Sequence, residues 1–184
     1  MSIFFEFDEV EEFTADVVGE PGSRVFFLTA RAGGRRVSVR CEKQQVKAIA
    51  TYLRHVLSDL PPPEVPPPPA APAGDDVAVP DDHEFVLGPV GLGYDRGNDR
   101  LLVQLEELVP TIGGEDDEDD DDEDEVIELA EDDPDRGHIR LYVTRSQAAA
   151  FCDHADELVA AGRPNCIWCG SPIDPDGHPC PRMN

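Results

Sequence analysis

The chain has 184 residues and a formal net charge of −25, from 40 acidic residues against 15 Lys and Arg. This length suits one domain or two small ones, and no run approaches the roughly 18 apolar residues that a membrane-spanning helix needs. The first residues lack the basic and apolar regions of a signal peptide, and the five cysteines suit a reducing compartment. We therefore expect a cytoplasmic protein without a membrane span.

Charge is unevenly distributed along the chain. Residues 24–54 hold eight Lys or Arg and one Glu, whereas residues 115–135 hold 16 acidic residues and no basic one. A block of like charges repels itself and stays solvated. The overall acidity therefore conceals a basic patch in the first third of the chain.

The N-terminal region predicts three strands followed by a helix. Residues 37–41 alternate apolar and polar side chains with a period of two, which is typical of a strand. The glycine pair at 33–34 predicts a tight turn before this strand, and residues 4–7 are a possible extra strand. The helix is predicted by one apolar stripe at helical spacing: Val46, Ile49, Ala50, Leu53, Val56 and Leu57.

A second region repeats this pattern, which indicates an internal duplication. Three segments of the first region match three segments of the second in order: Glu12–Gly19 with Glu84–Gly91, Arg24–Leu28 with Arg100–Gln104, and Val37–Cys41 with Ile139–Val143. The second helix carries the same apolar stripe 102 residues further along: Ala148, Phe151, Cys152, Ala155, Leu158 and Val159. The sequence thus predicts an α+β fold in which duplicated βββα units, residues 1–60 and 83–162, pack as one pseudo-symmetric body. Cys41 and Cys152 fall on its inward sides and are interpreted as buried structural thiols.

Two segments are predicted to lie outside this body. Residues 61–82 contain nine prolines and predict a stiff, extended linker between the units. Residues 109–138 hold the acidic block and predict a disordered insertion in a hairpin loop of the second unit.

Residues 163–184 predict a small zinc knuckle. Cys166 and Cys169 are spaced C-x-x-C, and His178 and Cys180 are spaced H-x-C. Three thiolates and one imidazole have the number and chemistry of a closed tetrahedral zinc site, which is typical of a structural rather than a catalytic metal. The segment is too short to build its own hydrophobic core, so zinc binding would supply its folding energy. A redox C-x-x-C pair and a set of unmetallated thiols are the alternatives.

The same residues carry a resemblance to a known family. The pattern Arg-Pro-x-Cys-x-x-Cys-Gly, followed by Asp-Pro-x-Gly-His-x-Cys-Pro-Arg, resembles the C-terminal signature of an uncharacterised actinobacterial family, a domain of unknown function. The segments at residues 19–28 and 37–45 are similar to the same family. The resemblance implies a cytoplasmic bacterial protein and implies no known activity.

Three functions are compatible with these features. The leading hypothesis is a non-enzymatic adaptor or regulatory protein whose zinc knuckle contacts an unidentified protein partner through Trp168, although Trp168 packed onto the second helix is an equal alternative. The second is a nucleic-acid-binding regulator, because the basic sheet face of the first unit could follow a phosphate backbone. Arg36 and Arg40 lie on that face, with Arg35 and Lys43 nearby. The third is an unrecognised enzyme, although no P-loop, G-x-S-x-G or H-E-x-x-H motif is present.

Overall fold

The computed structural model describes most of the chain apart from the two predicted spacers. The described residues are 3–20, 22–63, 83–109, 136–162, 166–171, 173 and 179–182. The predictions for the proline-rich linker and the acidic insertion therefore fall almost wholly outside the described residues, and so does the predicted ligand His178.

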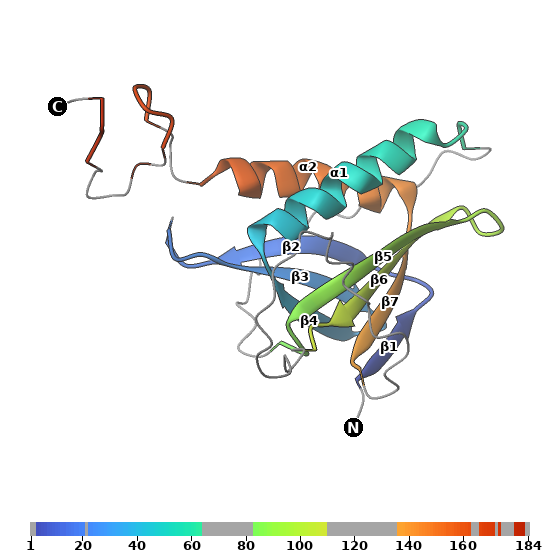
Figure 1. The fold of residues 1–184 in the computed structure, drawn as a ribbon. Helices are drawn as coiled ribbons and strands as arrows, with labels where there is room; N and C mark the ends of the chain where they lie inside the picture. Colours follow the sequence, from blue (N-terminus) through green and yellow to red (C-terminus); the bar gives the residue numbers. More distant parts are fainter. Residues whose placement is uncertain are drawn as a thin grey trace, which may run out of the picture.

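The described residues form two sheets and two helices (Figure 1). The first sheet is antiparallel and has the strand order β2 (Glu12–Val18), β3 (Val25–Ala32) and β4 (Arg35–Cys41). The second sheet has the strand order β1 (Phe4–Phe7), β7 (His138–Val143), β6 (Arg100–Glu107) and β5 (Leu87–Asp95). The helices, which pack against each other over one side of the sheets, are α1 (Lys43–Asp59) and α2 (Arg145–Ala160). The predicted α+β class is confirmed.

The N-terminal and C-terminal parts of the body exchange strand pairings. The extra strand β1 joins the second sheet, where it pairs in parallel with β7. In return, β4 of the first sheet pairs with the segment that precedes β5. The Arg40 N–H donates to the Phe85 carbonyl at 3.0 Å, and the Glu84 N–H donates to the Ser38 carbonyl at 2.8 Å. Because each part completes a sheet of the other, the body folds as one unit.

The alternation predicted for β4 and β7 is confirmed. One face of each strand is buried in the core, through Val37, Val39, Cys41, Ile139, Leu141 and Val143. Successive side chains of a strand point to opposite faces, so Arg36 and Arg40 lie on the face of β4 that is turned away from this core.

The strand register corrects the match predicted between β3 and β6. Leu28 of β3 lies opposite Val39, and Val103 of β6 lies opposite Leu141. With Val39 matched to Leu141 as predicted, the register pairs Leu28 with Val103, whereas the sequence match paired Leu28 with Gln104. The prediction was wrong by one residue because apolar side chains occur on both faces of β3, and the sequence pattern alone did not show which set faces the core.

The match predicted between β2 and β5 is also wrong. Ala15 of β2 lies opposite Leu28, and Leu92 of β5 lies opposite Val103. The register thus aligns Ala15 with Leu92, whereas the sequence match aligned it with Leu87, five residues earlier. A β-bulge between Leu87 and Val90 interrupts the ladder of β5. Because a bulge adds residues to one strand only, matching the two sequences residue by residue gives a different register.

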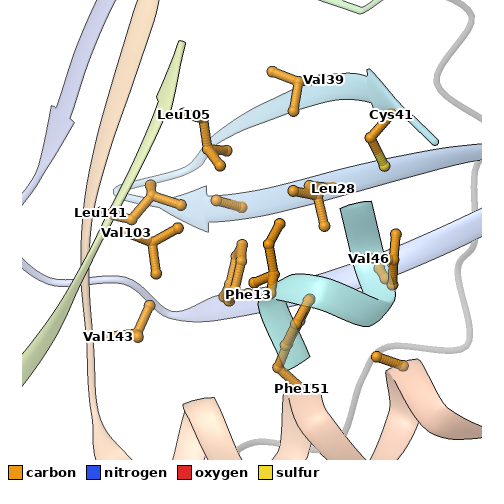
Figure 2. Close-up of a cluster of buried hydrophobic side chains, with 14 of the residues drawn as sticks. Phe13, Leu28, Val39, Cys41, Val46, Val103, Leu105, Leu141, Val143 and Phe151 are labelled. Atoms are coloured by element: carbon orange, nitrogen blue, oxygen red, sulfur yellow. The ribbon is translucent and has the colours of Figure 1, made fainter. Parts of the chain in front are cut away.

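The two sheets and the two helices enclose one hydrophobic core (Figure 2). Phe13 of β2 stacks on Phe151 of α2 with the ring centroids 4.5 Å apart. The largest side chains with less than 2% exposure are Phe151, Leu28, Leu53, Leu101, Ile139, Leu141, Val39, Val46, Val103, Val143 and Cys152. Each side chain of the size of Val, Leu or Phe contributes about 1.5–3 kcal/mol when it is fully buried, so this cluster stabilises the fold.

Both helices begin with a capping box, which supplies partners for the free N–H groups of a helix start. Glu42 and Gln45 form the box of α1, and Thr144 and Gln147 form the box of α2. Each glutamine amide reaches past its own helix to strand carbonyls, Gln45 at the start of β5 and Gln147 just before β2.

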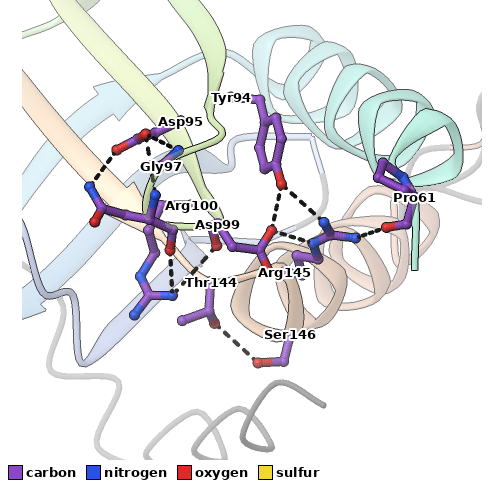
Figure 3. Close-up of polar contacts among 10 residues, drawn as sticks. Pro61, Tyr94, Asp95, Gly97, Asp99, Arg100, Thr144, Arg145 and Ser146 are labelled. Carbon is purple, nitrogen blue, oxygen red and sulfur yellow. Dashed lines mark hydrogen bonds and ion pairs between the residues drawn. The ribbon is translucent and has the colours of Figure 1, made fainter. Parts of the chain in front are cut away.

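The hairpin between β5 and β6 is fastened to α2 through Asp99 (Figure 3). Asp99 has a φ of 51°, a left-handed conformation that is unfavourable for most residues other than glycine. Its carboxylate accepts hydrogen bonds from Tyr94 Oη at 2.6 Å and Arg145 Nε at 2.7 Å. Arg145 also donates to the Pro61 carbonyl after the end of α1, at 2.6 Å. The hydrogen bond from Tyr94, together with Arg145, outweighs partial burial and lowers the pKa of Asp99.

Replacement of Arg145 by Met is expected to lower the free energy of unfolding by about 1–2 kcal/mol, because charge-assisted hydrogen bonds are lost. The folded-state pKa of Asp99 is lowered, so the Asp99 contribution is present above the unfolded-state pKa and is lost as the pH falls through the folded-state pKa. Urea unfolding should therefore show a difference between wild type and variant that shrinks in acid. Arg96→Met, in the exposed tip of the same hairpin, is the control, and a difference independent of pH would contradict the role of Asp99.

Candidate metal centre

Three cysteines from the C-terminal segment come together. The Sγ atoms of Cys166, Cys169 and Cys180 all lie within 4.8 Å of one another, and those of Cys166 and Cys180 are 3.8 Å apart. Two thiolates on one tetrahedral zinc ion, each at about 2.3 Å, are separated by about 3.8 Å. The sulfur spacing therefore fits a shared metal ion.

The backbone around Cys166 forms the turn that positions the first two sulfurs. The Gly170 N–H donates to the Cys166 carbonyl at 2.8 Å, and the Cys166 N–H donates to the Ser171 carbonyl at 2.8 Å. Gly170 has a φ of 75°, a left-handed conformation that glycine adopts without steric cost. The glycine after Cys169 thus allows the tight turn that brings the first two cysteines together.

The thiol of Cys180 has competing influences on its pKa. The backbone N–H of Arg182 donates to the sulfur and favours the thiolate, but partial burial and the neighbouring sulfurs of Cys166 and Cys169 outweigh it, so the pKa of Cys180 is raised. The neighbouring sulfurs thus disfavour the thiolate form of Cys180, and a bound cation is the group that reverses this preference.

The structure brings together three of the four predicted ligands. His178 lies outside the described residues. Among the residues that the structure does describe, no further His, Asp or Glu joins the three sulfurs. The described residues therefore define a three-sulfur group that could hold a metal ion.

Two apolar side chains stand between the first pair of cysteines. Trp168 is 56% exposed, and its neighbour Ile167 is 88% exposed. Sequence reasoning singled out Trp168 and missed Ile167, although the letters Cys-Ile-Trp-Cys show that both residues occupy the same short turn. Large apolar side chains at such exposure are candidates for contacts with another molecule.

The other two thiols belong to the core. Cys41 is 5% exposed and Cys152 is 2% exposed. Burial, followed by the charge of Glu42, raises the pKa of Cys41 to about 12. Burial is also the main cause of the raised pKa of Cys152, whose sulfur donates to the Ala50 carbonyl at 3.2 Å. The predicted role of both residues as buried thiols is confirmed.

These differences predict a two-stage reaction with a thiol reagent. In the native protein, a chelator should make the three sulfurs of the C-terminal segment reactive, because this segment loses its structure without the metal. Cys41 and Cys152 stay buried as neutral thiols and should react only after unfolding, because the thiolate is the nucleophile. Titration with a chromogenic disulfide, with and without chelator and then in denaturant, measures the stages. A variant with Ser at both core positions should lose only the last stage, and early reaction of five thiols would contradict the assignment.

The predicted basic face is partly neutralised by its own sheet. Arg36 lies 3.7 Å from the Asp16 carboxylate, while Arg40, Arg35 and Lys43 are exposed. Arg35 lies over the Phe5 ring, 5.1 Å from its centroid. Nearby, Arg31 lies 3.6 Å from the Glu12 carboxylate. Carboxylates among the arginines reduce the positive potential that a phosphate backbone would need.

Sequence reasoning missed a buried polar group on this face. Thr29 Oγ1 donates to Asp16 Oδ2 at 2.7 Å and lies 3.1 Å from Ser38 Oγ. All three residues are buried. The only signal in the sequence is the alternation that puts Thr29 and Ser38 between apolar residues, which by itself predicts solvent exposure.

Two small sheets, two helices and a three-sulfur group define an α+β protein with a candidate metal centre. The chain belongs to the family described as a protein of unknown function, DUF3090, whose family model matches residues 5–180 and so includes all three cysteines of the group. No significant match was found among curated proteins or among solved structures. The described part of the chain contains no helix with the length and apolar character needed to cross a bilayer.

Proposed function

We propose that the C-terminal segment is a structural zinc knuckle that presents Ile167 and Trp168 to a protein partner, which makes this chain an adaptor or regulatory protein. The observation that carries the proposal is the pairing of a three-sulfur group with two exposed apolar side chains in the same turn. The fourth ligand in this proposal is His178, two residues before Cys180.

Zinc is favoured by the chemistry of the donors. Thiolates are soft ligands that select zinc, copper(I) or iron–sulfur clusters over magnesium and calcium. Three sulfurs and one imidazole complete a tetrahedral set and leave no position for a substrate. A closed set of this kind supports a structural role for the ion.

Partner binding is favoured by the side chains at the turn. Tryptophan is enriched among the residues that dominate binding energy at protein interfaces, and the core of an interface is depleted of charge. Ile167 and Trp168 are adjacent in the sequence and together supply apolar, uncharged area. A rigid turn held by a metal also lowers the entropy lost when these side chains are immobilised.

The experiment is capture of partners from the native host with tagged wild type and variants. Trp168→Ala should lose the partner while zinc content and the circular dichroism of the body stay unchanged. Phe4→Ala is a matched control, because Phe4 is an aromatic side chain with 51% exposure on the body. A partner that is retained by Trp168→Ala and by Ile167→Ser would contradict the proposed contact.

We also propose that the body arose by duplication of a βββα unit. Support comes from the two helix-start glutamines, which lie 102 residues apart. Gln45 Nε2 donates to the carbonyls of Leu87 and Gly88, and Gln147 Nε2 donates to those of Val10 and Glu11. Val10 and Glu11 precede Leu87 and Gly88 by 77 residues. The same shift of 77 aligns Ala15 with Leu92. An experimental structure whose halves superpose best with other residue pairs would contradict the duplication.

A further inference from the structure

Among the described residues, the strand β5 carries a free backbone edge. The residues of β6 alternate between those that bond to β7 and those that bond to β5. Gly91, Gly93 and Asp95 lie opposite the β6 residues whose N–H groups point away from β7 and toward β5. The N–H and C=O groups of Val90, Leu92 and Tyr94 therefore point away from the sheet. Within the part of the chain that the structure describes, no backbone group bonds to them.

This edge lacks the protection that other edges of the body have. Natural proteins shield an exposed edge with charge, proline, a β-bulge, short length or a covering element. The opposite edge of the sheet, β1, is only four residues long. The edge of β2 is covered by α2, whose His154 Nε2 lies 3.1 Å from the Ala15 carbonyl. In β5, Pro89 and the bulge between Leu87 and Val90 protect the beginning of the edge. By contrast, the segment from Val90 to Tyr94 contains no charged side chain and no proline.

The helix α1 runs along β5 (Figure 1). Its start is tethered by Gln45 to the first residues of β5, and the Pro61 carbonyl just after its end meets Arg145, which also bonds Tyr94 at the end of β5. Between these anchors, Tyr52 follows Gln45 by two helical turns and so lies on the same face of α1. Tyr52 is 48% exposed.

A comparison of α1 and β5 with α2 and β2 shows that, within the described residues, β5 lacks the contact by which a helix closes the edge of β2. The shift of 102 residues between the helices aligns Tyr52 with His154, and the shift of 77 aligns Leu92 with Ala15. Where α2 closes the edge of β2 through His154 and Ala15, α1 offers an exposed aromatic ring beside an unpaired strand. This step uses the residue alignment of the proposed duplication, whereas the free edge of β5 does not depend on it.

We propose that β5 pairs with β5 of a second copy of this chain, antiparallel and with a two-fold axis at Leu92. The free groups are spaced symmetrically about Leu92, so Leu92 would pair with its own copy and Val90 with Tyr94 of the second copy. Three such pairs form a continuous antiparallel ladder across the dimer. Gly91 would lie opposite Gly93, and these small residues let the two backbones approach without side-chain interference.

The symmetry of the edge favours a second copy over an unrelated peptide. An isologous interface requires that one surface be complementary to itself, and the Val-Gly-Leu-Gly-Tyr segment meets this requirement in both its free groups and its small residues. The same axis would bring the exposed rings of Tyr52 from the two copies toward each other, since α1 flanks β5 on the same side in both.

The net charge sets the conditions under which this dimer forms. Each copy carries a formal charge of −25, so two copies repel each other at low ionic strength. Salt screens charges that lie further apart than about 10 Å at 0.1 M, whereas the ladder itself is uncharged. Association should therefore strengthen as salt is raised, the opposite of an interface held by ion pairs.

The test uses the intact protein in sedimentation velocity and light scattering at about 0.05 M and about 0.5 M NaCl. We expect a reversible dimer at the higher salt, favoured by rising concentration. Amide exchange by NMR gives a site-specific readout, because the N–H groups of Val90, Leu92 and Tyr94 should become protected as the dimer forms. A monomer under all these conditions, or a dimer in which these three amides stay unprotected, overturns the proposal.

Two variants with matched controls separate this edge from other contacts. Leu92→Pro removes the N–H at the two-fold axis and should abolish the dimer, while Leu92→Ala keeps the N–H and should leave a weaker dimer. Tyr52→Glu should weaken association, while Thr51→Glu, with the same change in charge on an exposed neighbour, should not. Cys166→Ser should leave the dimer unchanged. Loss of the dimer in Cys166→Ser would assign it to bridging by the knuckle and overturn pairing through β5, without bearing on the zinc site itself.

Discussion

Freshly purified protein is expected to contain about one equivalent of zinc, and Cys166→Ser is expected to contain little or none. Removal of one of three thiolates leaves a site in which the remaining sulfurs cannot complete a tetrahedral set. Because structural zinc in short segments supplies on the order of 10–16 kcal/mol of apparent binding energy at neutral pH, the C-terminal segment should lose its structure. Elemental analysis after gel filtration measures the metal content directly.

The body provides the control for this prediction. Cys152→Ser retains a donor toward the Ala50 carbonyl and lies in the core, so it should keep its zinc. In Cys166→Ser the circular dichroism and thermal unfolding of the body should be unchanged, since β1 to α2 form their own hydrophobic core. Zinc retained at the wild-type level in Cys166→Ser would rule out the site.

The His178→Ala variant tests the fourth ligand. With three thiolates left, the affinity for zinc should fall while binding persists at high metal concentration, because the open position can take a water molecule. Competition with a coloured chelator measures the change in affinity. An affinity equal to that of the wild type would show that the fourth ligand is another group.

Local patterns in the sequence predicted those elements whose side chains have a clear period. In α2, the stripe from Ala148 to Ala155 is buried as predicted, and in β4 the alternation of Val37, Val39 and Cys41 places these residues in the core. In both elements a single face is buried, so the period of the apolar residues fixes which side chains point inward.

The sequence could not predict how strands from distant parts of the chain pair. The strand β1 was predicted from its apolar residues, but its parallel pairing with β7 joins residues more than 130 positions apart, and nothing in either strand encodes the partner. The bulge in β5 likewise could not be predicted, because no residue type marks the position that leaves the ladder. The register of β5 therefore differs from the one that the sequence match implied.

The sequence likewise predicted some features of the candidate site and not others. The C-x-x-C spacing identified Cys166 and Cys169 because metal geometry restricts the separation of ligands in a turn, and Cys180 lies with them as predicted. The exposure of Ile167 and the burial of Asp16 depend on packing that the sequence does not specify. A buried carboxylate on the outward face of a sheet has no local signature.

The largest effect on stability is expected for Phe151→Ala. The Phe151 ring is 1% exposed, lies in the core that the two sheets and two helices share, and stacks on Phe13. Removal of a buried phenyl ring costs the transfer free energy of the ring and leaves a cavity, for a total of about 3–5 kcal/mol. A body of this size has a free energy of unfolding of roughly 5–15 kcal/mol, so the variant should be close to unfolding at 37 °C.

Chemical denaturation of the wild type and two variants measures this effect. Phe4→Ala removes the same ring from a position that is 51% exposed and should cost less than about 1 kcal/mol, as is usual for surface sites. Phe151→Leu should fall between the two, because it keeps most of the apolar volume. The contrast tests the packing itself, since both alanine variants lose the same atoms. Equal losses in Phe151→Ala and Phe4→Ala would mean that α2 does not pack on β2 as described, because the cost of a cavity depends on how completely its surroundings enclose it.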